Sequence, residues 1–134
     1  MGAWGTGVYE NDDALDWLSG LEEHGFSAIV GAFALVASGE CLECPCVGSA
    51  LAAADVVARM RSGDEPESGY AETASSWAAI HRDDDWSPLV GPAIAVLDRI
   101  ARPDDNENYE LWAETDELAA WLAVIADVKA RLVA

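Results

Sequence analysis

Apolar residues recur every three or four positions along most of the chain, which is the period of an α-helix. The first segment with this pattern predicts a helix over residues 12–23. Asn11 precedes it and can accept the unpaired N–H groups of its first turn, and Gly25 follows it as a terminating residue. Its buried face is expected to carry three leucines: Leu15, Leu18 and Leu21.

The same period continues to the end of the chain. It predicts further helices over residues 27–38, 47–62, 74–82, 87–102, 104–114 and 118–132. No segment alternates apolar and polar residues as a half-buried strand does. With 134 residues, the chain has the length of one domain. We therefore predict an all-α fold, a single domain over residues 1–134 built as a compact bundle of five to seven helices.

The third predicted helix is rich in alanine, whose small side chain permits neighbouring helices to pack closely. Within it, Asp55 and Arg59 have the i,i+4 spacing of a favourable ion pair, and we expect this pair to lie on the surface. Residues 63–70 contain glycine, proline and acidic residues, and they predict a solvated loop after the helix.

Charge is the strongest compositional signal. The chain has 25 acidic and 7 basic residues, a formal net charge of −18. So few cations cannot neutralise a phosphate backbone, so nucleic acid and anionic membranes are poor partners. The acidity keeps an apolar-rich chain soluble or reflects adaptation to salt, and the alternative is that it attracts a basic partner protein or cations. The first residues lack a secretory pattern and no apolar stretch is long enough to span a bilayer, so we expect a cytoplasmic protein.

Three cysteines lie within six residues, at Cys41, Cys44 and Cys46. This spacing could supply three thiolates to zinc or to an iron–sulfur cluster, with a fourth ligand from His24, His81 or a carboxylate. It could also form a redox pair. Because no second cysteine pair is present, we interpret the three as reduced, structural thiols, and we assign no metal or cofactor.

Familiar catalytic patterns are absent from the sequence. The Glu-x-x-His pairs of di-iron bundles do not occur, because Leu21 and Ala78 stand three residues before the two histidines. The serine of "CVGSA" lacks the strand that precedes a nucleophile elbow, and "GAWGTG" lacks the strand of a phosphate-binding loop. We therefore assign no catalytic residue. An enzyme that uses carboxylates for acid–base chemistry is an alternative, and it requires a cleft containing a carboxylate of raised pKa.

The glycine-rich start of the chain carries a more specific pattern. Its residues are Gly2, Trp4-Gly5-Thr6-Gly7, Tyr9, Asn11-Asp12-Asp13-Ala14 and Asp16-Trp17. This run resembles the start of the bacterial family called domain of unknown function 4259. The segments "ALAAADVVA" (residues 50–58) and "NENYELWAE" (residues 106–114) resemble later parts of the same family. The resemblance implies a small bacterial helical domain, and the family has no established activity.

We interpret five residues of this run as a structural signature: Trp4, Gly5, Gly7, Asn11 and Asp12. The two glycines allow a positive φ or a close approach to a neighbouring segment, and Trp4 and Tyr9 are expected to turn onto the bundle. The alternative is that Trp4, Asp12 and Asp16 line a ligand-binding groove.

A recognition surface is expected on the penultimate helix. Its four residues are Glu107, Tyr109, Glu110 and Trp112. Asp104 or Asp105 can cap this helix. The two aromatic residues lie three positions apart on one face, and rings beside carboxylates bind arginine side chains by stacking and by charge. The alternative is that the rings pack inward and that only the carboxylates are exposed.

Together these patterns predict a non-enzymatic acidic protein that acts by interaction or regulation. An immunity-type inhibitor of a basic toxin is one such protein, and its binding would weaken as salt rises. The alternatives are a metal-binding protein that uses Cys41, Cys44 and Cys46, and an enzyme with carboxylate chemistry.

Overall fold

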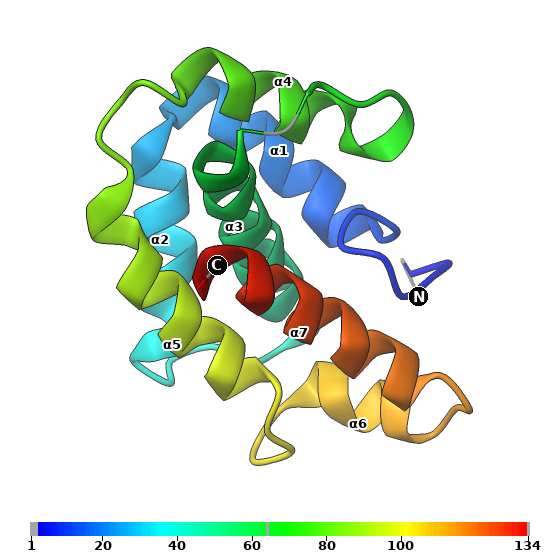
Figure 1. The fold of residues 1–134 in the computed structure, drawn as a ribbon. Helices are drawn as coiled ribbons and strands as arrows, with labels where there is room; N and C mark the ends of the chain where they lie inside the picture. The colour runs from blue at the N-terminus through cyan, green and yellow to red at the C-terminus, as the bar shows by residue number, and fades with distance from the viewer. Residues whose placement is uncertain (1–2, 64, 134) are drawn as a thin grey trace.

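Helices make up most of the protein (Figure 1). The computed structural model describes residues 3–63 and 65–133, so Gly2, the first residue of the glycine-rich run, lies outside the described residues. The helical elements are α1 (Asp12–His24), α2 (Phe26–Ala37), α3 (Cys44–Ser62), the 3₁₀ turn η1 (Gly69–Ala71), α4 (Glu72–His81), the 3₁₀ turn η2 (Ser87–Leu89), α5 (Val90–Ile100), α6 (Glu107–Ala113) and α7 (Leu118–Val133). The predicted all-α fold is confirmed. None of the described helices has the length and the apolar character to cross a membrane.

α3 is the central helix, and it packs against the six other α-helices of the described chain (Figure 1). Residues 50–58 are all buried, so α3 has core contacts on every side and not on one face alone. This segment is "ALAAADVVA", and its alanines and valines let neighbouring helices approach closely. The core of the protein is therefore built around the middle of α3.

α1 begins where the sequence predicts. The Asn11 side-chain oxygen accepts the Ala14 N–H at 2.8 Å, which is the expected cap. The buried face differs, because Ala14, Leu18 and Leu21 are buried whereas Leu15 is only half-buried. Positions 14, 18 and 21 span a narrower arc of a helix than positions 15, 18 and 21, so the former set fits better against α3.

The start of α6 also differs from the prediction, because Asn106 caps it in place of Asp104 or Asp105. The Asn106 side-chain oxygen accepts the Tyr109 N–H at 3.0 Å, and its amide nitrogen donates to the Ile100 carbonyl at 2.7 Å. Asn106 is completely buried, and it joins the end of α5 to the start of α6. A carboxylate could not replace it, since a carboxylate has no N–H to donate.

The expected surface pair of Asp55 and Arg59 is instead part of a buried cluster. Asp55 is 1% exposed. Its carboxylate accepts a hydrogen bond from the Tyr9 hydroxyl at 2.7 Å, and it pairs with Arg59 Nε at 2.6 Å and with Arg131 Nη2 at 2.5 Å. Arg59 also pairs with Glu67. A buried carboxylate requires such partners, and this one connects the opening segment, α3 and α7.

The start of α3 brings two cysteines together. α3 begins at Cys44, earlier than predicted, with Pro45 in its first turn. This turn places the Cα atoms of Cys41 and Cys46 5.9 Å apart, and the two sulfurs form a disulfide, whereas Cys44 is free. The interpretation of all three as reduced thiols is therefore wrong. While the disulfide is intact, the three cysteines cannot supply three thiolates to a metal.

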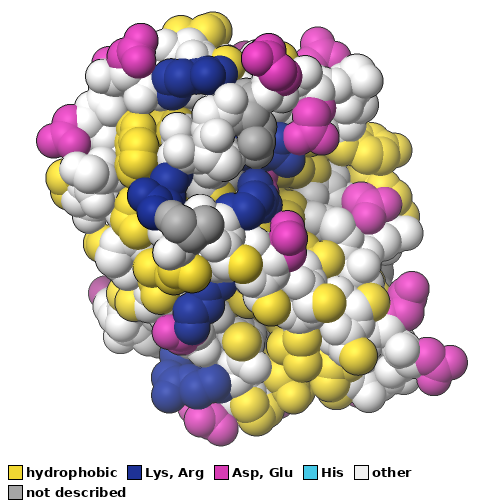
Figure 2. All heavy atoms as spheres, in the orientation of Figure 1, with side chains coloured by type: hydrophobic (Ala, Val, Ile, Leu, Met, Phe, Trp, Pro, Cys, Tyr) yellow, Lys and Arg dark blue, Asp and Glu magenta, His cyan; other side chains and the backbone are white. Residues whose placement is uncertain are grey.

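The basic side chains come from a few segments of the chain. Figure 2 shows Lys and Arg side chains along the middle of one face, with Asp and Glu side chains both beside them and around its edge. The sequence accounts for this arrangement, because neither residues 1–58 nor residues 103–128 contain a Lys or Arg. The acidic side chains of α1 and α6 therefore have no Lys or Arg on their own helix.

Candidate binding cavity

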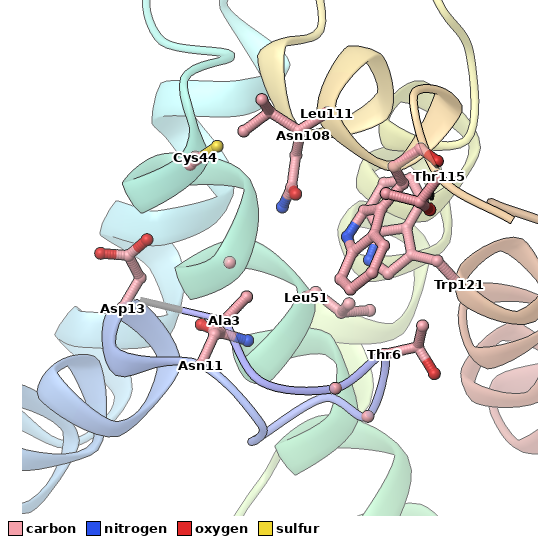
Figure 3. Close-up of a pocket in the computed structure, with 14 residues that line it drawn as sticks. Ala3, Thr6, Asn11, Asp13, Cys44, Leu51, Asn108, Leu111, Thr115 and Trp121 are labelled. Atoms are coloured by element: carbon pink, nitrogen blue, oxygen red, sulfur yellow. Dashed lines mark hydrogen bonds between the residues drawn. The ribbon is translucent and has the colours of Figure 1, made fainter. Parts of the chain in front are cut away.

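A small cavity of about 70 Å³ lies where the opening segment of the chain meets α6 and α7 (Figure 3). The first turns of α1 and α3 form its other side. The lining residues that matter most here are Gly5, Gly7, Asn11, Asp13, Cys44, Gly48, Asn108, Trp112 and Trp121. The glycine-rich run and the penultimate helix, two separate candidates in the sequence, thus meet around one cavity.

The opening segment folds back on itself to form one wall. Ala3 and Asn11 make an isolated antiparallel bridge, and the Glu10 carboxylate accepts the Gly7 N–H at 2.9 Å inside the fold. A Cβ atom added at Gly5 would lie 2.6 Å from that carboxylate, and one added at Gly7 would lie closer still. Neither glycine has a positive φ. Their role in the wall is therefore close approach to Glu10.

Trp4 does not turn onto the bundle as expected. It is 48% exposed, and its ring centroid lies 5.3 Å from that of Tyr70. Ala3 lines the cavity, and the next residue of an extended segment points to the opposite side. Asp12 and Asp16 are exposed and do not line the cavity either. The groove that Trp4, Asp12 and Asp16 were alternatively expected to form therefore does not coincide with this cavity.

Glu107 attaches α6 to the loop before α3. Its N–H donates to the Leu42 carbonyl at 3.1 Å, and its carboxylate accepts the Cys44 N–H at 2.9 Å. The hydrogen bond from the Cys44 backbone lowers the pKa of Glu107, because it stabilises the ionised carboxylate. The wall formed by α6 is thus fixed to the start of α3.

The four residues of the expected recognition surface divide into two pairs. Glu107 and Glu110 are exposed, whereas Tyr109 and Trp112 are half-buried. The Tyr109 ring meets the Trp121 ring edge-on at a centroid distance of 6.4 Å, and Trp112 lines the cavity. The carboxylates therefore face solvent, and the two aromatic rings face α7 and the cavity.

Several polar groups of the cavity wall are unpaired among the residues that the structure describes. Asn108 points into the cavity from α6, and Trp121 reaches it from α7 (Figure 3). Within the described part of the chain, neither the Asn108 amide nor the indole N–H groups of Trp112 and Trp121 make a hydrogen bond. These groups are available to a ligand. Asn108 and Trp121 were not identified as site residues from the sequence, where Trp121 fitted the helical core period.

Three carboxylates lie close to Asp13, which lines the cavity, and we call Asp12, Asp13, Asp16 and Glu107 the acidic rim. The pKa of Asp13 is raised by partial burial, and then by repulsion from the other three rim carboxylates. The opening segment, α1 and α6 contain no Lys or Arg that could offset this charge. The rim therefore has an unbalanced negative charge beside the cavity.

Nucleophilic chemistry is poorly supported at the cavity. Burial raises the pKa of the Cys44 thiol to about 12, and the Glu107 carboxylate adds to this shift by hydrogen bonding and charge. The thiol is therefore protonated at neutral pH and is a weak nucleophile. The Thr115 hydroxyl donates to the Trp112 carbonyl of its own turn at 2.7 Å.

Metal ligands do not converge at any point in the described chain. No group of three His, Cys, Asp or Glu side chains there could enclose an ion. His24 is exposed beside Glu23, and His81 pairs with Asp84 at 2.9 Å, so neither histidine reaches the cavity.

Comparison with known proteins places most of the chain in one family. A family model described as domain of unknown function (DUF4259) matches residues 2–124, which include all segments that form the cavity. No curated protein and no solved structure gives a match to the chain. The match covers most of the sequence and agrees with the resemblance of its first residues, so the chain belongs to the DUF4259 family.

Proposed function

We propose that the protein is a non-enzymatic binding protein that recognises a basic partner protein at the acidic rim. The observation that carries this proposal is the unbalanced charge of the rim, which lies on segments free of Lys and Arg. Such a surface attracts a cationic partner and accelerates its association, and salt screens the attraction. A cytoplasmic immunity-type inhibitor that masks a basic toxin is the form of this function that best suits the charge.

The chemistry at the cavity supports binding more than catalysis. Its thiol has a pKa of about 12, and its Thr115 hydroxyl donates to the Trp112 carbonyl. The free groups are an amide and two indole N–H groups, which bind ligands and do not transfer protons at neutral pH. The cavity therefore offers hydrogen-bonding groups to a ligand beside the negative charge of the acidic rim.

Partner capture with matched charge variants tests the proposal. The chain is immobilised and exposed to extract of its source cells at low and at high salt. The rim variant combines Asp12→Asn, Asp16→Asn and Glu107→Gln, and the control variant combines Glu22→Gln, Glu72→Gln and Asp83→Asn, which lie away from the cavity. Both variants change the net charge by the same amount.

We expect a basic protein to be captured at low salt by the wild type and by the control variant, and to be lost from the rim variant. Equal capture by the two variants would contradict recognition at the rim. A gene for a basic toxin directly beside the gene of this protein would support the inhibitor role.

An acid–base enzyme is a second candidate, and Asp13 is the observation that favours it. Asp13 lines a cavity and has a raised pKa, which are the properties of a carboxylate that exchanges protons. In that case Asp13→Asn should abolish turnover of a substrate found by screening. Unchanged turnover in this variant would exclude Asp13 as the base.

A further inference from the structure

We propose that the cavity beside the acidic rim binds the guanidinium group of an arginine side chain. This inference rests on the proposed function, because it names the group that a basic partner inserts into the protein.

The size of the cavity suits a small planar group. Its volume of about 70 Å³ is a few times the roughly 10–15 Å³ that a cavity needs to hold one water molecule. A guanidinium has four heavy atoms and fits such a space, whereas the ring of an aromatic ligand is larger. The narrow stem of an arginine side chain can extend from the cavity to its mouth.

Aromatic and polar groups line the cavity together. Trp112 and Trp121 contribute indole rings, whose faces attract a cation placed within about 6 Å of the ring centroid. Asn108 points into the same space, and its amide oxygen is free to accept an N–H. These three residues come from α6 and α7, so the two helices provide the uncharged contacts to the guanidinium.

The charged part comes from α1. Asp13 lines the cavity, and the other rim carboxylates lie close enough to raise its pKa. A bound guanidinium would donate to the Asp13 carboxylate and would offset the repulsion among the rim residues. An anionic ligand would meet this repulsion, and a neutral one would leave it in place.

Arginine suits this lining better than lysine. A guanidinium is planar, stacks on an indole ring, and donates hydrogen bonds in several directions at once. It could therefore stack on an indole ring and donate to Asn108 or to Asp13 at the same time. A lysine ammonium is compact and strongly hydrated, and it loses more on leaving water.

The test uses small arginine compounds, so that the partner protein is not needed. The complete chain is titrated with Nα-acetyl-arginine amide, and indole N–H resonances are followed by NMR with calorimetry in parallel. Nα-acetyl-citrulline amide has almost the same shape without the charge, and Nα-acetyl-lysine amide has the charge without the planar fork. We expect a dissociation constant on the order of 1 mM for the arginine compound. Shifts should appear at Trp112 and Trp121, and the other two compounds should bind at least about fivefold more weakly.

Two variants and two controls identify the site. Asp13→Asn and Trp112→Leu should each weaken binding of the arginine compound by about tenfold. Asp83→Asn and Trp4→Leu make the same chemical changes outside the cavity, and they should leave binding within about twofold of the wild type. Circular dichroism verifies that each variant is folded. If Trp112→Leu does not fold, the binding measured with Asp13→Asn tests whether the arginine compound binds in this cavity.

Equal binding of the citrulline or the lysine compound would overturn the assignment to a guanidinium. Binding that Asp13→Asn leaves unchanged, or shifts confined to other indoles, would overturn the assignment to this cavity. The proposed function has a separate outcome. If a partner is captured through the rim but the arginine compound does not bind, only the guanidinium proposal is overturned. If the arginine compound binds but no partner is captured through the rim, the guanidinium proposal is supported and the proposed function is contradicted.

Discussion

The Tyr9 hydroxyl donates a hydrogen bond of 2.7 Å to the Asp55 carboxylate, 46 positions later in the chain. Both residues are buried, at 4% and 1% exposure. Tyr9 belongs to the glycine-rich segment that forms one wall of the cavity, and Asp55 lies in the middle of α3. The contact therefore fixes the wall of the candidate site to the central helix.

Removing this hydroxyl tests how strongly the opening segment is held. Tyr9→Phe leaves the ring in the core but deprives a buried carboxylate of one donor, so we expect unfolding free energy to fall by about 1–2 kcal/mol. Urea denaturation followed by circular dichroism measures the change. Tyr70→Phe is the control, because Tyr70 is 56% exposed, and its effect should lie within about 0.5 kcal/mol. Equal effects of the two variants would contradict this account.

The ion pairs of Asp55 should differ strongly from those on the surface. Asp55→Asn removes the charge that Arg59 and Arg131 surround, and loss of one member of a buried pair costs about 3–5 kcal/mol. Asp98→Asn breaks the exposed pair between Asp98 and Lys129, at 2.7 Å, and should cost less than about 1 kcal/mol. Thermal unfolding of both variants measures the contrast. A small effect at Asp55 would show that the cluster does not stabilise the fold.

Tyr9 should also make the protein sensitive to alkaline pH. Burial raises the pKa of Tyr9 well above its usual value of 10, and the nearby Asp55 charge adds to the shift. The folded state therefore keeps this proton at a pH where the unfolded chain releases it. Its contribution to stability is complete below pH 10 and is lost as pH rises toward the folded pKa.

Spectroscopic titration measures this effect. Tyrosine absorbance should include one group that ionises only above the pH of a free tyrosine, and Tyr9→Phe should lack that group. The variant should also lose less stability than the wild type between pH 9 and about pH 11. Normal ionisation of every tyrosine in the folded protein would contradict the prediction.

The fold could be predicted from the sequence because apolar residues recur with the helical period along the chain and because some helix ends carry local signals. Asn11 is a clear example, since the side chain acts on a backbone group three residues away. Asn106 is a counterexample. It follows Asp104 and Asp105. The choice among the three polar residues depends on the Ile100 carbonyl at the end of α5, six positions before Asn106, which only an amide can satisfy while it caps the helix.

The candidate site was only partly predictable. The glycine-rich run and the penultimate helix were identified separately, and their meeting depends on how both pack around the start of α3. Asp55 gave a local signal, because it interrupts the apolar run of residues 50–58, but its partner Arg131 lies 76 positions later. Contacts of this kind arise from tertiary packing, which residue spacing does not report.

The Cys44 thiol should react slowly despite being the free cysteine. Thiolate is the reactive form, and a pKa of about 12 leaves very little of it at pH 8. We expect alkylation by iodoacetamide to be at least about tenfold slower in the folded protein than in the chain unfolded by urea. Glu107→Gln removes the charge that helps to raise this pKa, so it should accelerate the reaction. Glu110→Gln removes a charge from the same helix and should have little effect. Equal rates for the two variants would contradict the role of Glu107.

Asp13 should link binding to a cost in stability. Its pKa is raised in the folded protein by burial and by repulsion from the other rim carboxylates, so the folded state disfavours its charge. The contribution of Asp13 to stability is therefore greatest below pH 3.8 and is lost as pH rises through the raised pKa. At neutral pH, Asp13→Asn removes the penalty, and we expect Tm to increase by at most about 2 °C, since solvent screens much of the repulsion.

Asp12→Asn is the matched control for this prediction. Asp12 lies in the same first turn of α1 and is exposed, so its removal chiefly loses a favourable charge at the helix N-terminus. Its Tm should stay the same or decrease. Calorimetry at pH 7 and at pH 3 compares the two variants, and the gain from Asp13→Asn should disappear at the lower pH. Charged residues of a binding site commonly lower the stability of the free protein, because they repel one another until the ligand binds. Asp13 is expected to behave in this way. An Asp13→Asn variant that is less stable than Asp12→Asn at pH 7 would show that Asp13 serves the helix and not the cavity.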